Sequence, residues 1–317
     1  MRFSHKFNLT KHNQSDFDFV NIRVDRDNEL FIDPTRISAE GGKWFQNCNN
    51  IIQDFFSTIF NLYNKGQTDQ ARGYFQSSGE SNELFLGYTK GFPRGHGNSI
   101  ESLSKVFDYV LDQGLLDDAI VRSLEDIYLF VPDFGEDKFS DLVASLIKAE
   151  LVSFTQEQCK LHNIDLSTTL QFYYWDNKNH NWNFIQRELP GYDGHPILLV
   201  PKQILVSKYL YSPNRYWTQV VSVWRQQRHL EVNSILHRHR PDNEKYANKK
   251  DIRKAEITES NLTEKQYLIN MTRENFDMIK SFRDNVVNSQ KGSNSNKMSD
   301  NDLEIFIKNS YELVEWE

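Results

Sequence analysis

Two kinds of hydrophobic spacing divide this chain, and they limit the folds that it can adopt. Residues 43–64 repeat apolar side chains at helical intervals and predict a long amphipathic helix that ends at Gly66. Residues 138–162 repeat the same spacing and predict a second long helix. Residues 165–205 instead contain three β-type runs and predict an antiparallel meander. Helices and strands segregated in this way favour an α+β fold over a doubly wound sheet.

The remaining segments predict shorter elements around this framework. We expect two short strands within 17–34, a strand at 83–89, and helices at 68–76, 99–113, 117–130, 213–238 and 262–290. The composition then suggests three regions. They are a mostly helical domain with a small sheet at 1–164, a β-meander with helices at 165–290, and a linker with a terminal element at 291–317.

Composition excludes several classes of protein. With 38% hydrophobic residues in 317, the chain is globular and large enough to bury a core without metal or disulfide support. Cys48 and Cys159 are too few for a disulfide framework or a zinc site, so we expect two buried free thiols. The net charge of −7 argues against a protein that coats DNA non-specifically. Without a secretory signal or a membrane-length apolar run, we expect a soluble, cytoplasmic protein with no membrane partner.

The most acidic part of the chain surrounds the start of the second long helix. Residues 112–141 hold nine carboxylates against two cations, a balance equal to that of the whole chain. Helix capping and the helix dipole explain part of this pattern. Asp137 and Asp141, however, are four residues apart and share a polar helix face, where they repel each other unless a cation lies between them.

This pair suggests a metal-dependent catalytic site. Mg²⁺ or Mn²⁺ binds one or two carboxylates and leaves room for water and phosphate oxygens. We therefore predict that Glu80, Asp137 and Asp141 hold the metal, and that Lys138 or Lys202 assists the attacking water. The acidic residue followed by Asp/Glu-X-Lys, typical of restriction-type nucleases, is present only in fragments, at 136–138, 176–178 and 200–202.

A glycine-rich segment at 79–97 is a second candidate. Lys90, Arg94 and His96 lie in a loop that could hold a phosphate at the start of the next helix. The segment lacks the Gly-Lys-Ser/Thr of a P-loop and the glycine order of a dinucleotide-binding turn. A mobile surface loop is the alternative.

A basic strip at 225–254 is the third candidate. It carries nine cations and four acids in a chain that is otherwise acidic. A solvated charged face is the simplest explanation, but such a strip also suits a nucleic-acid backbone or an acidic partner. The predicted binding residues are Arg225, Arg228, Arg238, Arg240, Lys249, Lys250 and Arg253.

Three segments carry a resemblance to a known group of proteins. "LFIDPTRI" at 30–37, "FGEDKFSDLVASLIKAELVSFTQEQC" at 134–159 and "PILLVPKQIL" at 196–205 resemble an uncharacterised bacterial family met near mobile-element and antiphage-defence genes. The resemblance implies that Asp33, Asp137, Ser140, Asp141 and Lys202 belong together.

Together these features predict a component of a bacterial antiphage system, a metal-dependent nuclease or related phosphodiester enzyme. Its partners would be nucleic acid, a protein subunit of the same system, or both. The alternatives are a non-catalytic subunit that binds a partner protein or nucleic acid, and a sensor of nucleotides or small molecules.

Overall fold

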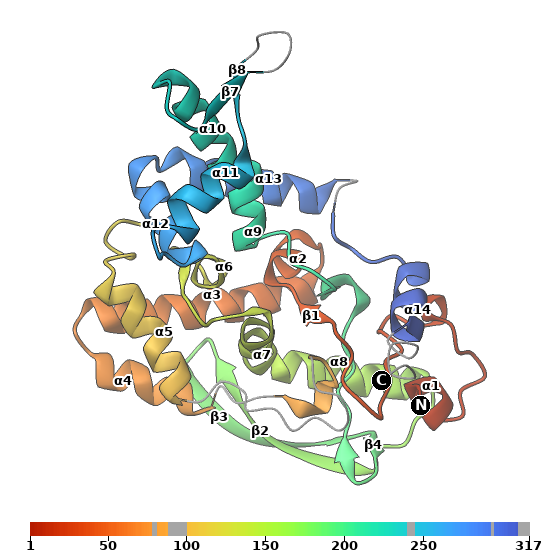
Figure 1. The fold of residues 1–317 in the computed structure, drawn as a ribbon. Coiled ribbons are helices and arrows are strands. Elements are labelled where there is room, and N and C mark those ends of the chain that lie inside the picture. Colours follow the sequence, from red (N-terminus) through yellow and green to blue (C-terminus); the bar gives the residue numbers. More distant parts are fainter. Residues whose placement is uncertain (78–80, 88–99, 240–244, 293–294, 310–317) are drawn as a thin grey trace. The chain divides into compact units, whose positions relative to one another are not determined.

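A computed structural model describes residues 1–77, 81–87, 100–239, 245–292 and 295–309 (Figure 1). The chain forms two compact units, and each joins segments that are distant in sequence. Unit 1 contains residues 1–105, 136–209 and 294–317, and unit 2 contains residues 106–135 and 210–293. The regions expected from composition, with boundaries after 164 and 290, follow chain order and therefore do not match this grouping.

Helices form most of unit 1. The longest, α3, packs against α2, α4 and α7. The α-helices of this unit are α1 (Phe3–Lys6), α2 (Pro34–Ala39), α3 (Lys43–Asn64), α4 (Thr68–Gly73), α7 (Glu136–Leu146), α8 (Lys148–Leu161) and α14 (Asp300–Asn309). Short 3₁₀ helices occur at Gln14–Asp16 (η1), Tyr74–Ser77 (η2), Asn82–Leu84 (η3) and Lys202–Ile204 (η4).

The strands of unit 1 form three separate antiparallel pairs. β2 (Thr168–Asp176) pairs with β3 (Asn181–Leu189), so that Trp175 lies opposite Trp182. β1 (Phe31–Ile32) pairs with β6 (Leu205–Val206), and β4 (Gly191–Tyr192) pairs with β5 (His195–Pro196). Phenylalanines fill much of the core, among them the fully buried Phe3, Phe19, Phe31, Phe55, Phe75 and Phe85.

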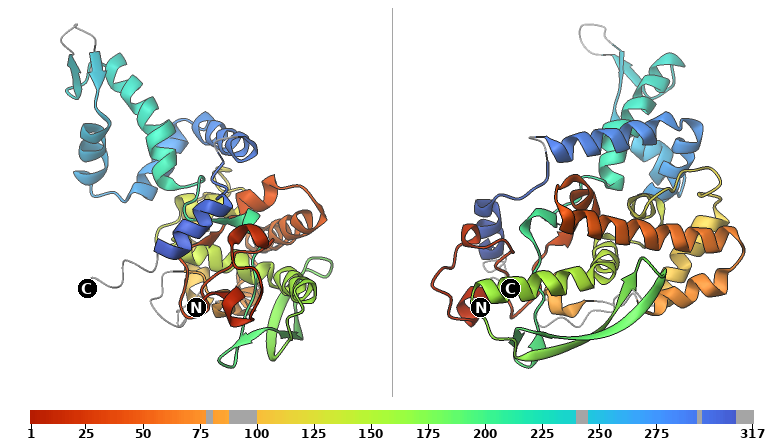
Figure 2. Two further views of the ribbon diagram at one scale, coloured as in Figure 1. Left: turned by 90° about the vertical axis from the view of Figure 1, so that its right-hand side faces the viewer. Right: turned by 180° about the vertical axis from the view of Figure 1, so that it is seen from behind.

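Unit 2 is mainly helical and carries one short ribbon. Helix α5 (Ile100–Asp112) crosses the boundary between the units at residue 105, and α6 packs against α9 and α12. The other elements are α6 (Leu124–Phe130), α9 (Pro213–Tyr216), α10 (Ser222–Glu231), α11 (Lys249–Arg253), α12 (Glu264–Glu274), α13 (Asp277–Lys291), the π-helices η5 (Trp217–Val221) and η6 (Lys254–Thr258), and the strands β7 (His237–His239) and β8 (Lys245–Ala247). Within this unit, α10 and the β7–β8 ribbon extend away from α13 (Figure 2).

Asp126 connects three distant segments of unit 2. Its carboxylate is completely buried and accepts the backbone N–H groups of Arg122 and Ser123, which caps α6. The hydroxyl of Tyr211 donates a hydrogen bond to Asp126 Oδ1 at 2.5 Å. The guanidinium of Arg283, on α13, donates to both carboxylate oxygens at 3.2 and 2.9 Å. The Asp126 carboxylate therefore connects segment 106–135 to the beginning of segment 210–293, at Tyr211, and to its end, at Arg283.

The structure confirms the α+β class and several predicted elements. The long helix occupies residues 43–64 as predicted, and Gly66 follows it with a φ of 70°, the left-handed conformation of a glycine C-cap. The β2–β3 hairpin is also confirmed, and α12 begins after the N-cap Thr263, which forms a capping box with Gln266. Cys48 and Cys159 are buried free thiols, as expected. No helix in the described ranges is long and apolar enough to cross a membrane.

Other expected elements are wrong, for identifiable reasons. The helix predicted at 138–162 is two helices, α7 and α8, because the chain turns at the fully buried Ile147. No Gly or Pro marks this break in the sequence, and packing of Ile147 in the core determines its position. The third strand of the meander is wrong, because Leu205–Val206 pair with the distant β1. The strand predicted at 83–89 is not formed in its described part, 83–87, because η3 is followed by Phe85 at a φ of 54°, and 88–89 lie outside the described residues.

Removing the Asp126 carboxylate should destabilise unit 2 strongly. Asp126→Ala leaves the partly buried Arg283 without its counter-ion, which costs about 3–5 kcal/mol in buried pairs. As a control, Asp118→Ala breaks the exposed pair with Arg273 and should cost about 1 kcal/mol or less. Urea unfolding followed by circular dichroism measures both. Equal losses would contradict the central role of Asp126.

Candidate functional site

Asn28 brings two distant segments of unit 1 side by side. The backbone N–H of Asn28 donates to the Phe85 carbonyl at 2.8 Å, and its side-chain amide donates to the same oxygen at 2.7 Å. The Gly87 N–H in turn donates to the Asn28 carbonyl at 3.0 Å. Residues 85–87 therefore lie next to the segment that contains Asn28, and Gly87 is close to Asp27.

The turn before Gly87 is fixed from a second side. Glu83 forms an ion pair with Lys148 of α8 at 2.8 Å, and both side chains are almost fully buried. The Glu83 carbonyl also accepts the Leu198 N–H at 2.8 Å. Glu83 is therefore a structural carboxylate whose charge is neutralised, and it anchors the segment that ends at Gly87.

Helix α7 brings a third component to the same point. The Ile32 N–H donates to the buried Ser140 Oγ at 3.0 Å, and the Phe139 ring packs on Tyr209 with centroids 5.2 Å apart. These contacts hold the first turns of α7 against β1. The first turn carries Asp137, whose carboxylate points at Gly87.

The carboxylates of Asp27 and Asp137 face the same glycine. A Cβ atom on Gly87 would lie 2.9 Å from Asp137 Oδ1 and 3.6 Å from Asp27 Oδ2. Gly87 also has a φ of 125°, which L side chains rarely adopt. Only glycine fits here without rearrangement, so the backbone and the two carboxylates can approach closely. We call this arrangement the Asp27–Asp137 pair.

The environment of the Asp137 carboxylate is unfavourable for negative charge. Burial raises the pKa of Asp137, and no charge or hydrogen bond among the described residues offsets that rise. Asp27 is buried, whereas Asp137 remains accessible to solvent. Two carboxylates that face one point favour a shared proton or a bound cation.

The other predicted metal-site residues have different surroundings. Asp141 lies one turn after Asp137 on α7, and both Asp141 and Lys138 have interaction partners. The Lys202 amine donates to the Gln14 carbonyl at 2.9 Å and to Asp300 at 2.5 Å, which ties η4 to η1 and α14. Among the described residues, no three His, Cys, Asp or Glu side chains form a group that could hold a metal ion.

Several predicted residues cannot be placed. Glu80 of the metal site, Lys90, Arg94 and His96 of the phosphate loop, and Arg240 of the basic strip lie outside the described residues. Their roles, and the sensor function that depends on the loop, therefore stay predictions.

Asp33 has a structural role in this fold. It caps α2 by accepting the Thr35 N–H at 2.8 Å, and its second oxygen accepts the Asn296 amide at 3.2 Å. Burial raises its pKa despite these hydrogen bonds. The Asp33 N–H donates to the Ile204 carbonyl at 2.9 Å, and the neighbouring Ile32 N–H donates to Ser140. The three segments that contain Asp33, Ser140 and Lys202, which the resemblance grouped, therefore meet around β1.

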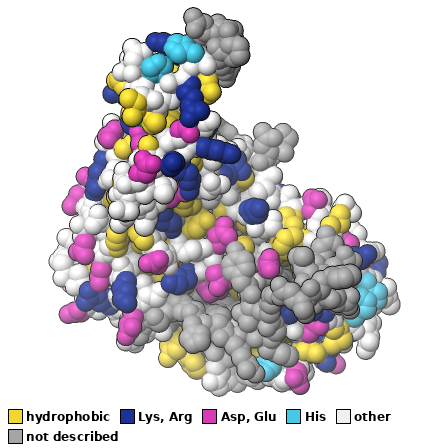
Figure 3. Space-filling model, in the orientation of Figure 1, with side chains coloured by type: hydrophobic (Ala, Val, Ile, Leu, Met, Phe, Trp, Pro, Cys, Tyr) yellow, Lys and Arg dark blue, Asp and Glu magenta, His cyan; other side chains and the backbone are white. Residues whose placement is uncertain are grey.

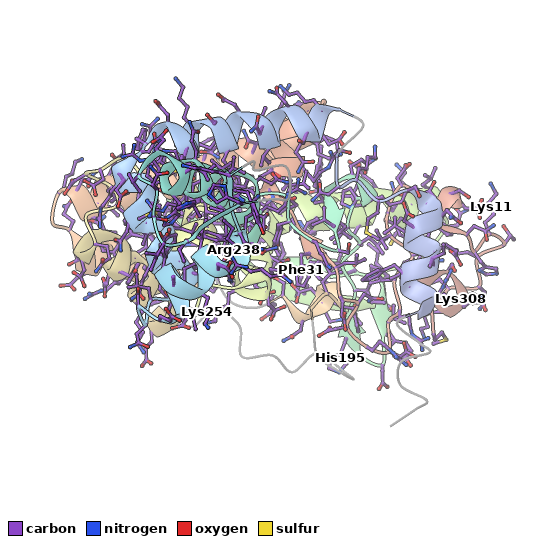
Figure 4. The ribbon with its side chains drawn as sticks, turned by 45° about the horizontal axis from the view of Figure 1, so that its top comes forward. Lys11, Phe31, His195, Arg238, Lys254 and Lys308 are labelled. Carbon is purple, nitrogen blue, oxygen red and sulfur yellow. The ribbon has the colours of Figure 1, made fainter. Side chains whose placement is uncertain are left out.

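Acidic side chains of unit 2 pair with much of the basic strip. Arg225 bonds Glu256 at 2.5 Å, Arg228 bonds Glu231 at 3.0 Å, Arg238 bonds Asp251 at 2.5 Å, and Arg253 bonds Glu264. Lys249 donates to the Thr218 carbonyl at 2.7 Å, and Lys250 is exposed. Figure 4 labels two residues of the basic strip, Arg238 on β7 and Lys254 at the start of η6.

Asp27 was not among the site residues predicted from the sequence. The available signals were local: an Asp-Asn pair at 27–28 and a glycine at 87. Neither reveals the hydrogen bonds of Asn28 to Phe85, which span almost sixty residues of sequence. The predicted Asp137 is in the site, but its partner there is a residue from another segment.

Comparison with known proteins places the chain in a family. Residues 8–212 match the family described as Domain of unknown function (DUF8370). The chain belongs to this family. No curated protein and no solved structure matches it. The DUF8370 region contains the Asp27–Asp137 pair and ends before the basic strip, and it gives no link to defence genes.

Replacing Asp137 should stabilise the fold at neutral pH. A carboxyl group whose pKa is raised on folding contributes stability below its unfolded pKa and loses it as the pH rises through the folded value. Asp137→Asn avoids that loss, so its melting temperature should exceed that of the wild type at about pH 7, with a smaller gain at about pH 3.

The control for this measurement is Asp165→Asn, because Asp165 is an exposed carboxylate of the same unit. Thermal unfolding of the three proteins at both pH values is the test. A destabilised Asp137→Asn at neutral pH would show that the carboxylate has a structural partner.

Proposed function

We propose that this DUF8370 protein is a metal-dependent enzyme of the nuclease type that cleaves phosphodiesters at the Asp27–Asp137 pair. The observation that carries the proposal is the convergence of these two carboxylates on Gly87. Burial raises the pKa of Asp137, and a cation bound beside its carboxylate would oppose that rise.

The chemistry of the pair suits a hard divalent cation. Mg²⁺ and Mn²⁺ bind one or two carboxylates and keep positions for water and phosphate oxygens. When bound, such an ion would polarise a phosphate and favour attack by water. Asp27, held rigidly in the interior, would fix the position of the ion, and the accessible Asp137 would face the substrate side.

The glycine between the carboxylates supports the same proposal. A side chain at position 87 would occupy the space next to Asp137 Oδ1. Glycine instead lets the backbone lie close to the Asp137 carboxylate, with a φ of 125°, and unusual backbone of this kind often marks functional positions. Lys138 follows Asp137 on α7 and is the predicted residue best placed in sequence to assist the water.

Cleavage assays with defined variants test this function. Labelled single-stranded DNA, duplex DNA and RNA should be cut with Mg²⁺ or Mn²⁺ and remain intact with a chelator. Asp27→Asn and Asp137→Asn should each lower the rate by more than the 10–100-fold that loss of an outer-shell partner typically costs. Asp165→Asn serves as the matched control and should cleave at the wild-type rate.

Metal binding can be followed without a substrate. Mn²⁺ should raise the melting temperature of the wild type and leave that of Asp137→Asn unchanged, because a ligand stabilises only the state that binds it. If Mn²⁺ has no effect on the wild type and no nucleic acid is cut, the proposed function is wrong.

A role in antiphage defence rests on the resemblance of segments 30–37, 134–159 and 196–205. It is tested by phage challenge of cells that carry the wild-type or the Asp137→Asn gene. Equal plating on both would remove that role.

A second candidate function is that of a non-catalytic subunit that binds a partner. The observation in its favour is that the basic strip lies after the DUF8370 region, which ends at residue 212. A binding surface there would leave the core of the family region unchanged.

A further inference from the structure

We propose that the far end of unit 2 binds a protein segment in which carboxylates alternate with aliphatic side chains. This tip surface consists of Arg228, Val232, Ile235, Arg238, His239 and Lys245. The inference is independent of phosphodiester cleavage, because all six residues belong to unit 2 and the Asp27–Asp137 pair belongs to unit 1.

A single turn brings these residues together. Helix α10 ends at Glu231, and Asn233 adopts a φ of 46°, which reverses the chain. β7 then pairs with β8, so that His239 lies opposite Lys245. The Lys245 amine donates to Asn233 Oδ1 at 2.6 Å, which closes the ribbon onto the turn. Basic, histidine and hydrophobic side chains gather at this end of unit 2 (Figure 3).

The base of the tip is held by a polar network. His229 Nδ1 lies 2.8 Å from Ser234 Oγ, and its Nε2 lies 2.7 Å from Glu256 Oε1. Burial alone would raise the pKa of Glu256, but hydrogen bonds from Arg225 and Tyr267 hold it below its usual value, so the carboxylate stays charged. The turn is therefore preorganised, which lowers the entropic cost of binding.

The apolar side chains of the tip are unusually exposed. Ile235 is 99% exposed and Val232 is 67% exposed. Both are aliphatic and lie within one turn, between the end of α10 and β7. Aliphatic side chains grouped on a surface are typical of interaction sites, and their burial by a partner would contribute hydrophobic free energy.

The charge around these side chains determines the sign of the partner. Residues 222–239 and 245–250 contain six Lys and Arg and one acid, Glu231. Of the cations, Arg228 and Arg238 keep more than half of their side-chain surface exposed although they contact Glu231 and Asp251. Basic side chains therefore predominate among these described residues, which favours a partner that carries carboxylates.

The same features favour a protein segment over nucleic acid. Nucleic-acid platforms use exposed aromatic rings on which bases stack. The most exposed apolar side chains here are Ile235 and Val232, which cannot stack, and the Trp224 ring lies under Arg225 and Arg228 at 5.5 and 5.8 Å. Carboxylates interspersed with Leu or Ile match both the charge and the apolar centre.

Fluorescence anisotropy with the full chain tests this proposal. The probe is a synthetic labelled peptide in which Glu alternates with Leu. We expect saturable binding that weakens as salt is raised. Ile235→Asp should weaken it about tenfold or more, because it removes apolar contact and adds a like charge. Lys245→Glu should weaken it through charge alone.

Val287→Asp provides the matched control. Val287 is also an exposed aliphatic residue of unit 2, at 48%, but it lies on α13 away from the tip (Figure 2). This variant should bind the peptide like the wild type. Melting curves establish that all variants are folded, and wild-type cleavage by Ile235→Asp would separate the tip from the Asp27–Asp137 pair.

Single-stranded DNA and phosphatidylserine vesicles provide the competing outcomes. The proposal is overturned if the peptide does not bind, or if Ile235→Asp and Val287→Asp bind it equally. Loss of DNA binding in Ile235→Asp, with no peptide binding, would assign the tip to nucleic acid. The corresponding result with vesicles would assign it to a lipid surface.

Discussion

The buried carboxylate of Asp126 is the interaction on which the organisation of unit 2 depends. An ionised group without water is costly unless hydrogen bonds and a counter-ion compensate it. Asp126 receives these from the start of α6, from Tyr211 and from Arg283, so burial is possible only when three distant segments assemble. The group therefore acts as a requirement for correct assembly, and the tip surface is carried by the unit that it holds together.

The two functional proposals concern sites whose charged groups differ in how they are compensated by neighbouring residues. Some buried acids have a clear counter-ion, as Glu83 has Lys148 and Asp126 has Arg283. Asp137 differs, because burial raises its pKa and no charge or hydrogen bond from the described residues opposes the rise. In unit 2 several strip cations, such as Arg238, pair with acids, and Ile235 is an aliphatic side chain that stays exposed near them.

The sequence predicted the features that depend on residues close together in the chain and missed those that depend on residues far apart. The helix at 43–64 and its end at Gly66 depend on neighbours within a few residues, and both were predicted correctly. Asp137 was identified because acids cluster locally in the sequence. Asp27 was not, because its proximity to Asp137 requires the hydrogen bonds between Asn28 and Phe85. Lys202 was assigned to the site, but its amine is held by Asp300 near the other end of the chain.

The sequence by itself determined the α+β class, the amphipathic helices, the β2–β3 hairpin and the separation of acidic from basic segments, because these features depend on local spacing and composition. The tertiary structure decided where helices end against the core, as at Ile147, and which strands pair, as β1 pairs with β6. It also decided that Glu83 pairs with Lys148 and that Asp27 and Asp137 both lie next to Gly87. Burial and long-range hydrogen bonds fix these outcomes, and both arise only when distant segments meet.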